Sequence, residues 1–224
     1  MSNPSPEVPP SSSLEARARP SGTSQATIER REATDEMVDE LVPLVREAGN
    51  PYYDWFFGGE AAALPALRAC MLRPSSEISI RRVTLFALGD RVVGGLIALP
   101  GREVEGCRAA DAVAALGQAG PTERAEILAR MRATRGLFPP VPEDAFYGSK
   151  FWIVPPLRGH GLAGRLAKEF FAIGEEMGFR RFRGDVWAGN RSAVRLYEAY
   201  GFRTVAETTR PGAGMTYLTM IREA

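Results

Sequence analysis

The chain has 224 residues, of which 45% are hydrophobic and 25% charged, and its formal net charge at pH 7 is +1. This length suits one domain with a sizeable core, and the balanced charge excludes an overall field that would recruit nucleic acid or an anionic membrane. Cys70 and Cys107 are too few for a disulfide scaffold and lack zinc-site spacing, and no apolar run suits a membrane span or secretion signal, so we expect a cytoplasmic protein without a metal.

The N-terminal residues 1–26 are rich in Pro and Ser and poor in large apolar side chains. Such a segment cannot bury enough surface to offset the entropy lost on ordering, so we expect a disordered tail before a domain over 27–224. Apolar residues then recur with a helical period over 37–45, after Thr34, which is a suitable N-cap. Pro43 is expected to kink or shorten this helix.

An aromatic cluster, NPYYDWFFGGE, occupies residues 50–60 and precedes a second expected helix near 61–72. It is typical of a connection between helices. Two runs rich in β-branched and apolar residues follow at 83–88 and 91–99. The Gly-Asp pair between these runs is a two-residue turn, so the sequence predicts a β-hairpin.

Residues 101–147 form an unusually long excursion before the next expected strand. The segment contains two Ala-rich helical stretches, near 109–117 and 122–135, with Thr122 as the cap of the second. It ends in the Pro-rich LFPPVPED. Long insertions in compact domains usually serve a function, such as that of a lid, so we treat this segment as a helical insertion.

The remaining chain alternates strands with helices around a glycine-rich loop. We expect strands at about 148–154, 181–187, 202–208 and 214–221, and helices at about 161–177 and 190–200. This order predicts an α/β fold with a mixed sheet.

The stretch LRGHGLAG at 157–164 has the G-x-G-x-x-G spacing of a phosphate-binding turn. Any loop that presents backbone N–H groups at a helix N-terminus attracts phosphate, so the glycines alone do not identify the ligand. Asp185 lies about where the ribose-binding acid of a dinucleotide site would lie, which keeps NAD open. Against NAD, Pro155 and Pro156 interrupt the preceding strand, and too little chain follows for a long parallel sheet.

Two ordered motifs resemble those of the GNAT superfamily of acetyl-CoA-dependent N-acyltransferases. IVPPLRGHGLAG resembles motif A, and the matching positions are Ile153, Pro155, Arg158, Gly159, Gly161 and Ala163. WAGNRSAVRLYEAYGFR resembles motif B, and the matching positions are Asn190, Ala193, Leu196, Tyr197, Gly201 and Phe202. The resemblance implies a single-domain fold whose mixed, mostly antiparallel sheet is splayed at the cofactor strand and flanked by helices. The insertion at 101–147 departs from the family pattern.

The resemblance also implies acetyl-CoA as the cosubstrate. Backbone groups of the splayed strand would bind the pantetheine amides, and the loop would bind the pyrophosphate at the positive end of the next helix. Asn190 would cap the last helix, contact coenzyme A, or do both. The residues implied in cofactor binding are Phe151, Trp152, Ile153, Arg158, Gly159, His160, Gly161, Leu162, Ala163, Gly164 and Asn190.

Catalytic roles follow from the same resemblance. Tyr197 occupies the position from which family members commonly protonate the leaving thiolate, although an aromatic residue on an apolar helix face also fits plain packing. Asp185 occupies a position where some members carry the base that deprotonates the amine, with Glu103 and water as alternatives. His160 is the only histidine, so we expect a loop contact from it rather than a Ser-His-Asp or Cys-His device.

The insertion and the aromatic cluster favour a closed, partly apolar pocket for a small molecule. The candidate substrate-binding residues are Tyr53, Trp55, Phe56 and Glu103, with Asp144 and Asp185 as further acids that would hold an ammonium. We expect direct acetyl transfer to a primary amine of an amino acid, amino sugar or amine-bearing antibiotic. A protein or peptide acceptor, a non-catalytic acyl-CoA or dinucleotide-binding module, and a homodimer stay open.

Overall fold

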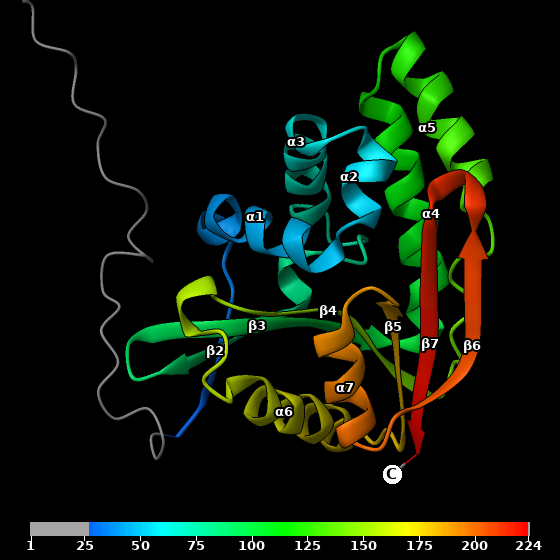
Figure 1. Ribbon diagram of the computed structural model, residues 1–224. Coiled ribbons are helices and arrows are strands. Elements are labelled where there is room, and N and C mark those ends of the chain that lie inside the picture. The colour runs from blue at the N-terminus through cyan, green and yellow to red at the C-terminus, as the bar shows by residue number, and fades with distance from the viewer. Residues whose placement is uncertain (1–26, 224) are drawn as a thin grey trace, which may run out of the picture.

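The computed structural model describes residues 27–223, so the tail expected at 1–26 lies outside the described residues. Within them, seven strands form one sheet in the order β1-β2-β3-β4-β5-β7-β6 (Figure 1). Neighbouring strands run antiparallel except β4 and β5, which are parallel. This confirms the mixed, mostly antiparallel sheet. The strands are Glu29–Glu32 (β1), Val83–Leu88 (β2), Arg91–Pro100 (β3), Ala145–Ile153 (β4), Arg181–Trp187 (β5), Arg203–Arg210 (β6) and Met215–Glu223 (β7).

Helices cover both faces of the sheet (Figure 1). The helices are Val38–Gly49 (α1), Tyr52–Phe57 (α2), Glu60–Met71 (α3), Gly101–Gln118 (α4), Pro121–Ala133 (α5), Leu162–Glu176 (α6) and Arg191–Ala199 (α7). On one face, α1 and α3 pack over β2 and β3 in a core that includes Val42, Leu67 and Leu85. On the other, α6 packs through Leu166 and Phe170. No helix in the described part of the chain is long and apolar enough to cross a membrane.

The first helix and the hairpin largely follow the prediction. Helix α1 continues past Pro43 to Gly49, so Pro43 does not end it, and its apolar side chains are buried along one face. Thr34 precedes a short 3-10 turn and makes no side-chain capping bond, so its expected role as a cap is wrong. The aromatic cluster forms a helix of its own, α2, rather than only a connection.

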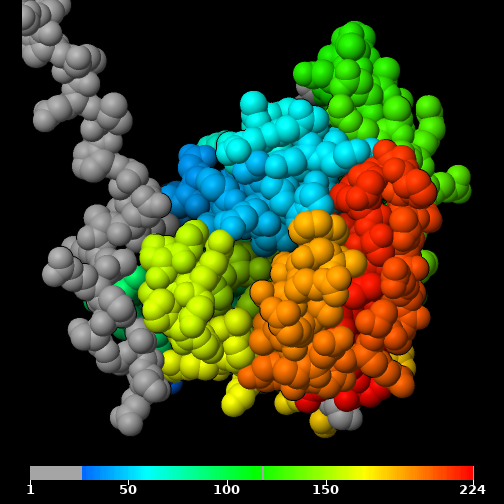
Figure 2. Space-filling view, in the orientation of Figure 1, coloured from blue at the N-terminus to red at the C-terminus, as the bar shows by residue number. Residues whose placement is uncertain are grey.

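The insertion differs from the prediction at both helix starts. Helix α4 begins at Gly101, and a Cβ on that residue would lie 1.9 Å from the Pro142 carbonyl oxygen. The glycine therefore permits a close backbone approach and does not break the helix. Helix α5 is capped at Gly120, whose N–H donates to the Glu123 carboxylate over 3.0 Å, so the expected cap at Thr122 is wrong. The far ends of α4 and α5 project beyond the rest of the molecule (Figure 2).

Candidate functional site

Strands β4 and β5 pair only over their first halves. Their register runs from Ala145 opposite Arg181 to Gly148 opposite Gly184, and there it ends. Beyond this point β4 continues beside β3, and β5 continues beside β7. The two strands diverge in the middle of the sheet. Each therefore presents to this gap a backbone edge without a ladder partner among residues 27–223.

The glycine loop lies between the end of β4 and the start of α6. Gly159 and Gly161 have positive φ angles of 79° and 75°, which side chains with a Cβ rarely adopt. A Cβ built on either residue meets no atom within 4 Å, so the space in front of this backbone is open. Gly161 is the N-cap of α6, which puts the loop at the positive end of the helix. The loop thus has the properties of an anion-binding turn.

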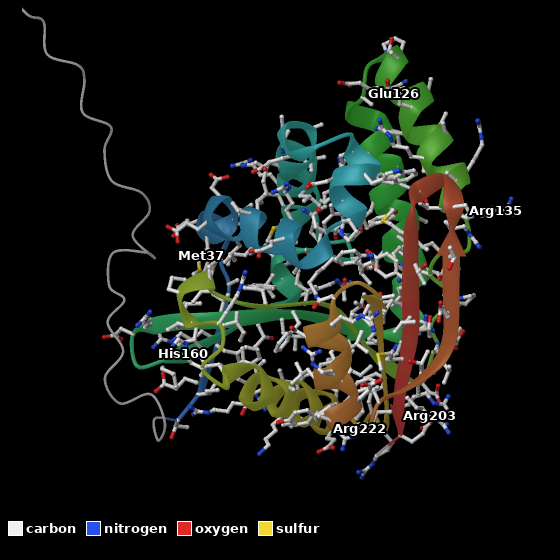
Figure 3. The ribbon with its side chains drawn as sticks, viewed as in Figure 1. Met37, Glu126, Arg135, His160, Arg203 and Arg222 are labelled. Atoms are coloured by element: carbon white, nitrogen blue, oxygen red, sulfur yellow. The ribbon has the colours of Figure 1, made fainter. Side chains whose placement is uncertain are left out.

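Side chains around the loop are held by local contacts. The Arg158 guanidinium donates to both carboxylate oxygens of Glu47 on α1, over 2.5 and 2.8 Å, and to the Ile153 carbonyl over 3.0 Å. The His160 ring lies 2.9 Å from the Arg158 carbonyl oxygen, at the outer end of the loop (Figure 3). Leu162 and Ala163 pack into or against the core beneath α6.

Gly164 lies directly under the side chain of Tyr200, the C-cap of α7. The Tyr200 hydroxyl donates to the Gly164 carbonyl over 2.8 Å, and a Cβ on Gly164 would lie 2.6 Å from that hydroxyl. A glycine is needed here so that α7 can approach α6 closely. Asn190, at the other end of α7, accepts the Ala193 N–H over 3.1 Å and is the N-cap of this helix.

A cavity of about 350 Å³ adjoins the gap, because the unpaired ends of both β4 and β5 line it. Its aromatic lining residues are Tyr52, Tyr53, Phe56, Phe57, Phe138, Tyr147, Phe151, Trp187, Tyr197 and Tyr217. The 101–147 insertion supplies another part of the wall through Arg108, Asp111, Ala112, Ala115, Met131, Thr134 and Phe138. A single cavity therefore joins the gap, the aromatic α2 and the insertion.

The residues expected to bind the acceptor are only partly brought together. Tyr53 and Phe56 line the cavity. Trp55 instead packs against the small core around Leu137. Glu103 lies in the first turn of α4, outside the cavity lining, and its carboxylate accepts from Arg82 over 2.7 Å.

Tyr197 lies on α7 against the point where the strands diverge. A Cβ on Gly184, the last paired residue of β5, would lie 3.8 Å from the Tyr197 hydroxyl oxygen. The side chain lines the large cavity and also a smaller one, of about 30 Å³, bordered by α6 and α7. Burial, and next the nearby charge of Asp185, raise the pKa of Tyr197 to about 12. Its phenol therefore keeps its proton at neutral pH.

Asp185 is held in a hydrogen-bond network beside the gap. Only 2% of its side chain is exposed. One carboxylate oxygen accepts from Arg183 over 2.8 Å and from Thr219 over 2.9 Å, and the other accepts from the Tyr147 hydroxyl over 3.2 Å. Three donors thus hold the carboxylate in place, and they use about three of its four acceptor sites.

A buried charged cluster at the cavity wall was not anticipated from the sequence. The Glu77 carboxylate accepts from Ser149 on β4 over 2.5 Å and from Arg108 on α4 over 2.9 Å. The Lys150 ammonium lies 3.6 Å from the same carboxylate and donates to the Ser149 hydroxyl over 2.9 Å. Burial alone raises the pKa of Glu77, but Lys150 and Arg108 outweigh it and lower this pKa to about 2. No motif marks these residues.

This cluster predicts an acid-dependent stability. A carboxyl whose pKa falls from 4.5 to about 2 on folding stabilises the fold above pH 4.5, and this stabilisation is lost as the pH falls toward 2. Glu77→Gln should therefore lower the free energy of unfolding by about 3 kcal/mol at pH 7, because Lys150 and Arg108 lose their buried partner. The difference from the unmodified protein should shrink below pH 4.5 in denaturant titrations.

Glu105→Gln is the matched control for this experiment. Glu105 lies 3.7 Å from the same Arg108, but 67% of its side chain is exposed. Removal of its charge should change stability by less than about 1 kcal/mol at any pH. Equal losses in the two variants would contradict a special contribution from the buried carboxylate.

Known proteins resemble this chain in sequence family and in fold. A family model described as "Acetyltransferase (GNAT) family" matches residues 45–202. No curated protein sequence matches. An N-acetyltransferase from Staphylococcus aureus Mu50 aligns at a TM-score of 0.65 and 16% identity, covering 87% of this chain and 100% of that one. The likeness at such identity is one of fold.

Two further solved structures are named for small amines. A Drosophila melanogaster polyamine N-acetyltransferase, which forms N-acetylagmatine, aligns at a TM-score of 0.53 and 16% identity over 88% of this chain and 100% of its own. A mutant agmatine N-acetyltransferase aligns at 0.52 and 17% identity over 88% and 99%. These again share the fold of the present chain.

Proposed function

The chain belongs to the acetyltransferase (GNAT) family, and we propose that it transfers the acetyl group of acetyl-CoA directly to the primary amine of a small molecule. The observation that carries this proposal is the gap between β4 and β5, which opens into an aromatic cavity and ends near the glycine loop. The two structural neighbours named for agmatine and polyamine are consistent with a small acceptor.

The residues at the gap and the loop fit acetyl-CoA. The open space in front of Gly159 and Gly161 is one that a side chain would fill, and it lies at the positive end of α6. Loop N–H groups over 159–164 would hold the pyrophosphate. The unpaired edge of Phe151–Ile153 would bind the pantetheine amides through backbone, since the Trp152 side chain is buried under α1 and α3.

Each part of the reaction has a candidate group in this chain. Acetyl-CoA supplies an acetyl thioester, which an uncharged amine attacks directly. Backbone N–H groups along the gap would stabilise negative charge on the thioester oxygen. Tyr197 holds a proton at its phenol oxygen and would donate it to the departing sulfur. Because Asp185 is already paired with Arg183 in a buried network and Glu103 lies outside the cavity lining, we assign the amine proton to water.

The form of the cavity favours a small molecule over a peptide. A volume of about 350 Å³ lies near the lower end of ligand pockets, which hold roughly 300–1,000 Å³. A protein acceptor needs an open groove for an extended chain. The insertion instead forms a wall of the cavity, with Arg108, Ala112 and Phe138 facing it.

The direct test is an amine panel with acetyl-CoA. Release of free thiol and a product heavier by one acetyl group should appear with at least one small primary amine, and should require both substrates. Peptides with free N-termini or lysines serve as the comparison. Turnover of peptides alone would replace the small-molecule acceptor, and thermal stabilisation by acetyl-CoA without any turnover would indicate a binding module.

Gly161→Val tests the cofactor site separately from catalysis. A ligand that binds only the folded state raises the Tm, so acetyl-CoA should stabilise the unmodified protein and NAD should not. Valine at position 161 strains a backbone with φ of 75° and fills the open space, so the shift with acetyl-CoA should disappear.

Gly178→Val is the matched control for backbone strain. Gly178 also has a positive φ, of 87°, and a Cβ on it also meets nothing within 4 Å, but it follows the opposite end of α6. This variant should lose stability as Gly161→Val does, while it keeps the acetyl-CoA shift. An undiminished shift in Gly161→Val would remove the basis for placing the pyrophosphate in this loop.

A further inference from the structure

The acids expected to hold an incoming ammonium are already paired. Glu103 accepts from Arg82 over 2.7 Å, and Asp144 accepts from Arg181 over 2.8 and 2.9 Å, while neither lines the cavity. Asp185 does line it, but its carboxylate accepts from three donors, one of them Arg183. Each of these three acids is therefore already paired with an arginine.

The two remaining acids of the wall are no more available. Glu77 lies between Lys150 and Arg108. Asp111 accepts the Glu77 N–H over 3.0 Å with one oxygen, and its other oxygen is sealed from solvent without a hydrogen-bond partner among the described residues. A ligand could reach that oxygen only if the wall moved.

Among four charged side chains of the wall, Arg108 presents the most surface, while Lys150 and Glu77 are about equally buried. Exposed fractions of the side chains are 23% for Arg108 and 12% for Lys150, against 10% for Glu77 and 2% for Asp185. Both hydrogen bonds from the Lys150 ammonium go to Ser149. The third N–H of the ammonium is not used by these bonds, and the Glu77 carboxylate lies 3.6 Å from the nitrogen, so a ligand carboxylate would compete only with that longer contact.

The balance of charges around the cavity also argues against a ligand with two cationic groups. The lining acids are Glu77, Asp111 and Asp185, and they are balanced by Arg108, Lys150 and the Arg183 that pairs with Asp185. A second cationic group on the ligand would add an unpaired charge to a site with a largely aromatic wall, which is costly. A carboxylate on the ligand would instead compensate the charge of the amine before it is deprotonated.

We propose that the acceptor is an amino acid with an aromatic or large apolar side chain, whose carboxylate binds at Lys150 and Arg108 while its body packs against the aromatic wall. This rests on the proposed acetyl transfer and specifies its substrate. The wall fits such a body, since α2 contributes Tyr53 and Phe56, and Phe138 of the insertion stacks edge-on against Tyr217. The agmatine-type acceptors of two structural neighbours, which carry two cationic groups, do not match these charges.

Matched pairs of amines test the proposal in the unmodified protein. L-phenylalanine, L-tyrosine and L-tryptophan are each compared with the amine that lacks only the carboxylate, and agmatine is added as a dication. In the pair that is turned over best, the amino acid should have a kcat/KM about 10- to 100-fold higher, as expected for a charge-assisted hydrogen bond. A preference for the decarboxylated amine, or for agmatine, would overturn it.

A binding measurement keeps this test separate from the proposed function. 3-Phenylpropanoate has the ring and the carboxylate but no amine, so it cannot be acetylated, and 3-phenylpropanamide is its neutral counterpart. Calorimetry should show tighter binding of the carboxylate by about tenfold or more. If no amine is acetylated but this preference is found, the acetyl transfer fails and the anion site stands. Equal binding of the two compounds overturns the anion site whatever the turnover.

Lys150→Met locates the preference on one side chain. It keeps most of the apolar stem and removes the charge, so the ratio of amino acid to decarboxylated amine should fall at least about tenfold. Lys168→Met, at the exposed position of the chain's other lysine on α6, should keep the ratio. An unchanged ratio in a folded Lys150→Met protein would contradict the assignment to Lys150. If that variant does not fold, the binding of 3-phenylpropanoate against 3-phenylpropanamide decides whether the anion site exists.

Discussion

Tyr197→Phe should lower kcat by roughly 100-fold or more, because general acid catalysis typically contributes about 10²- to 10⁴-fold. The ring still fills its place against Gly184 and beside Phe202, so the fold and the affinity for acetyl-CoA should change little. Steady-state kinetics with the best amine, together with the acetyl-CoA thermal shift, would separate the two effects. In the unmodified protein the pKa of about 12 means that kcat should not fall between pH 7 and about pH 10 through loss of this proton.

Tyr200→Phe is the natural comparison because it removes a hydroxyl from the residue that caps the same helix. It loses the bond to the Gly164 carbonyl, which should cost about 1 kcal/mol of stability. Its kcat should fall far less than that of Tyr197→Phe. Similar kinetic losses in both variants would indicate that the two tyrosines only support packing, and that water protonates the sulfur.

Ala112→Trp should abolish detectable acceptor turnover, with a loss of roughly 100-fold or more, while acetyl-CoA still raises the Tm. Ala112 lies on α4 and lines the cavity, so an indole at this position would occupy the space of the acceptor. Ala109→Trp is the control, because it enlarges an exposed position of the same helix. Unimpaired turnover in Ala112→Trp would show that the acceptor does not use this cavity.

The parts of the fold that the sequence predicted well are those where local geometry demands a particular residue. Gly161 is needed for a positive φ at the start of α6, and Asn190 caps α7 with its own side chain. Such requirements act within a few residues, so they leave short motifs. The order of strands and helices around the loop followed from the same local patterns.

The charged cluster could not be predicted because it depends on tertiary packing. Glu77 comes from a loop after α3, Arg108 from the insertion and Lys150 from β4, and none of them has a local partner that explains its burial. Single charged residues in a sequence are normally expected on the surface. Gly101 also depends on tertiary packing, since its lack of a side chain permits the close approach of Pro142, while its low helix propensity argues locally against a helix start.

The gap in the sheet also divides the amide protons of β4 into two kinds. In an extended strand, successive N–H groups point to alternate edges, and beyond Gly148 only the edge toward β3 is laddered. Hydrogens on that edge are protected by the sheet, whereas those on the other edge exchange with solvent until a ligand accepts them. Hydrogen exchange at alternate amides along Ser149–Ile153 should therefore slow when a ligand fills the gap. This measurement would detect binding of the acyl donor in the absence of any acceptor.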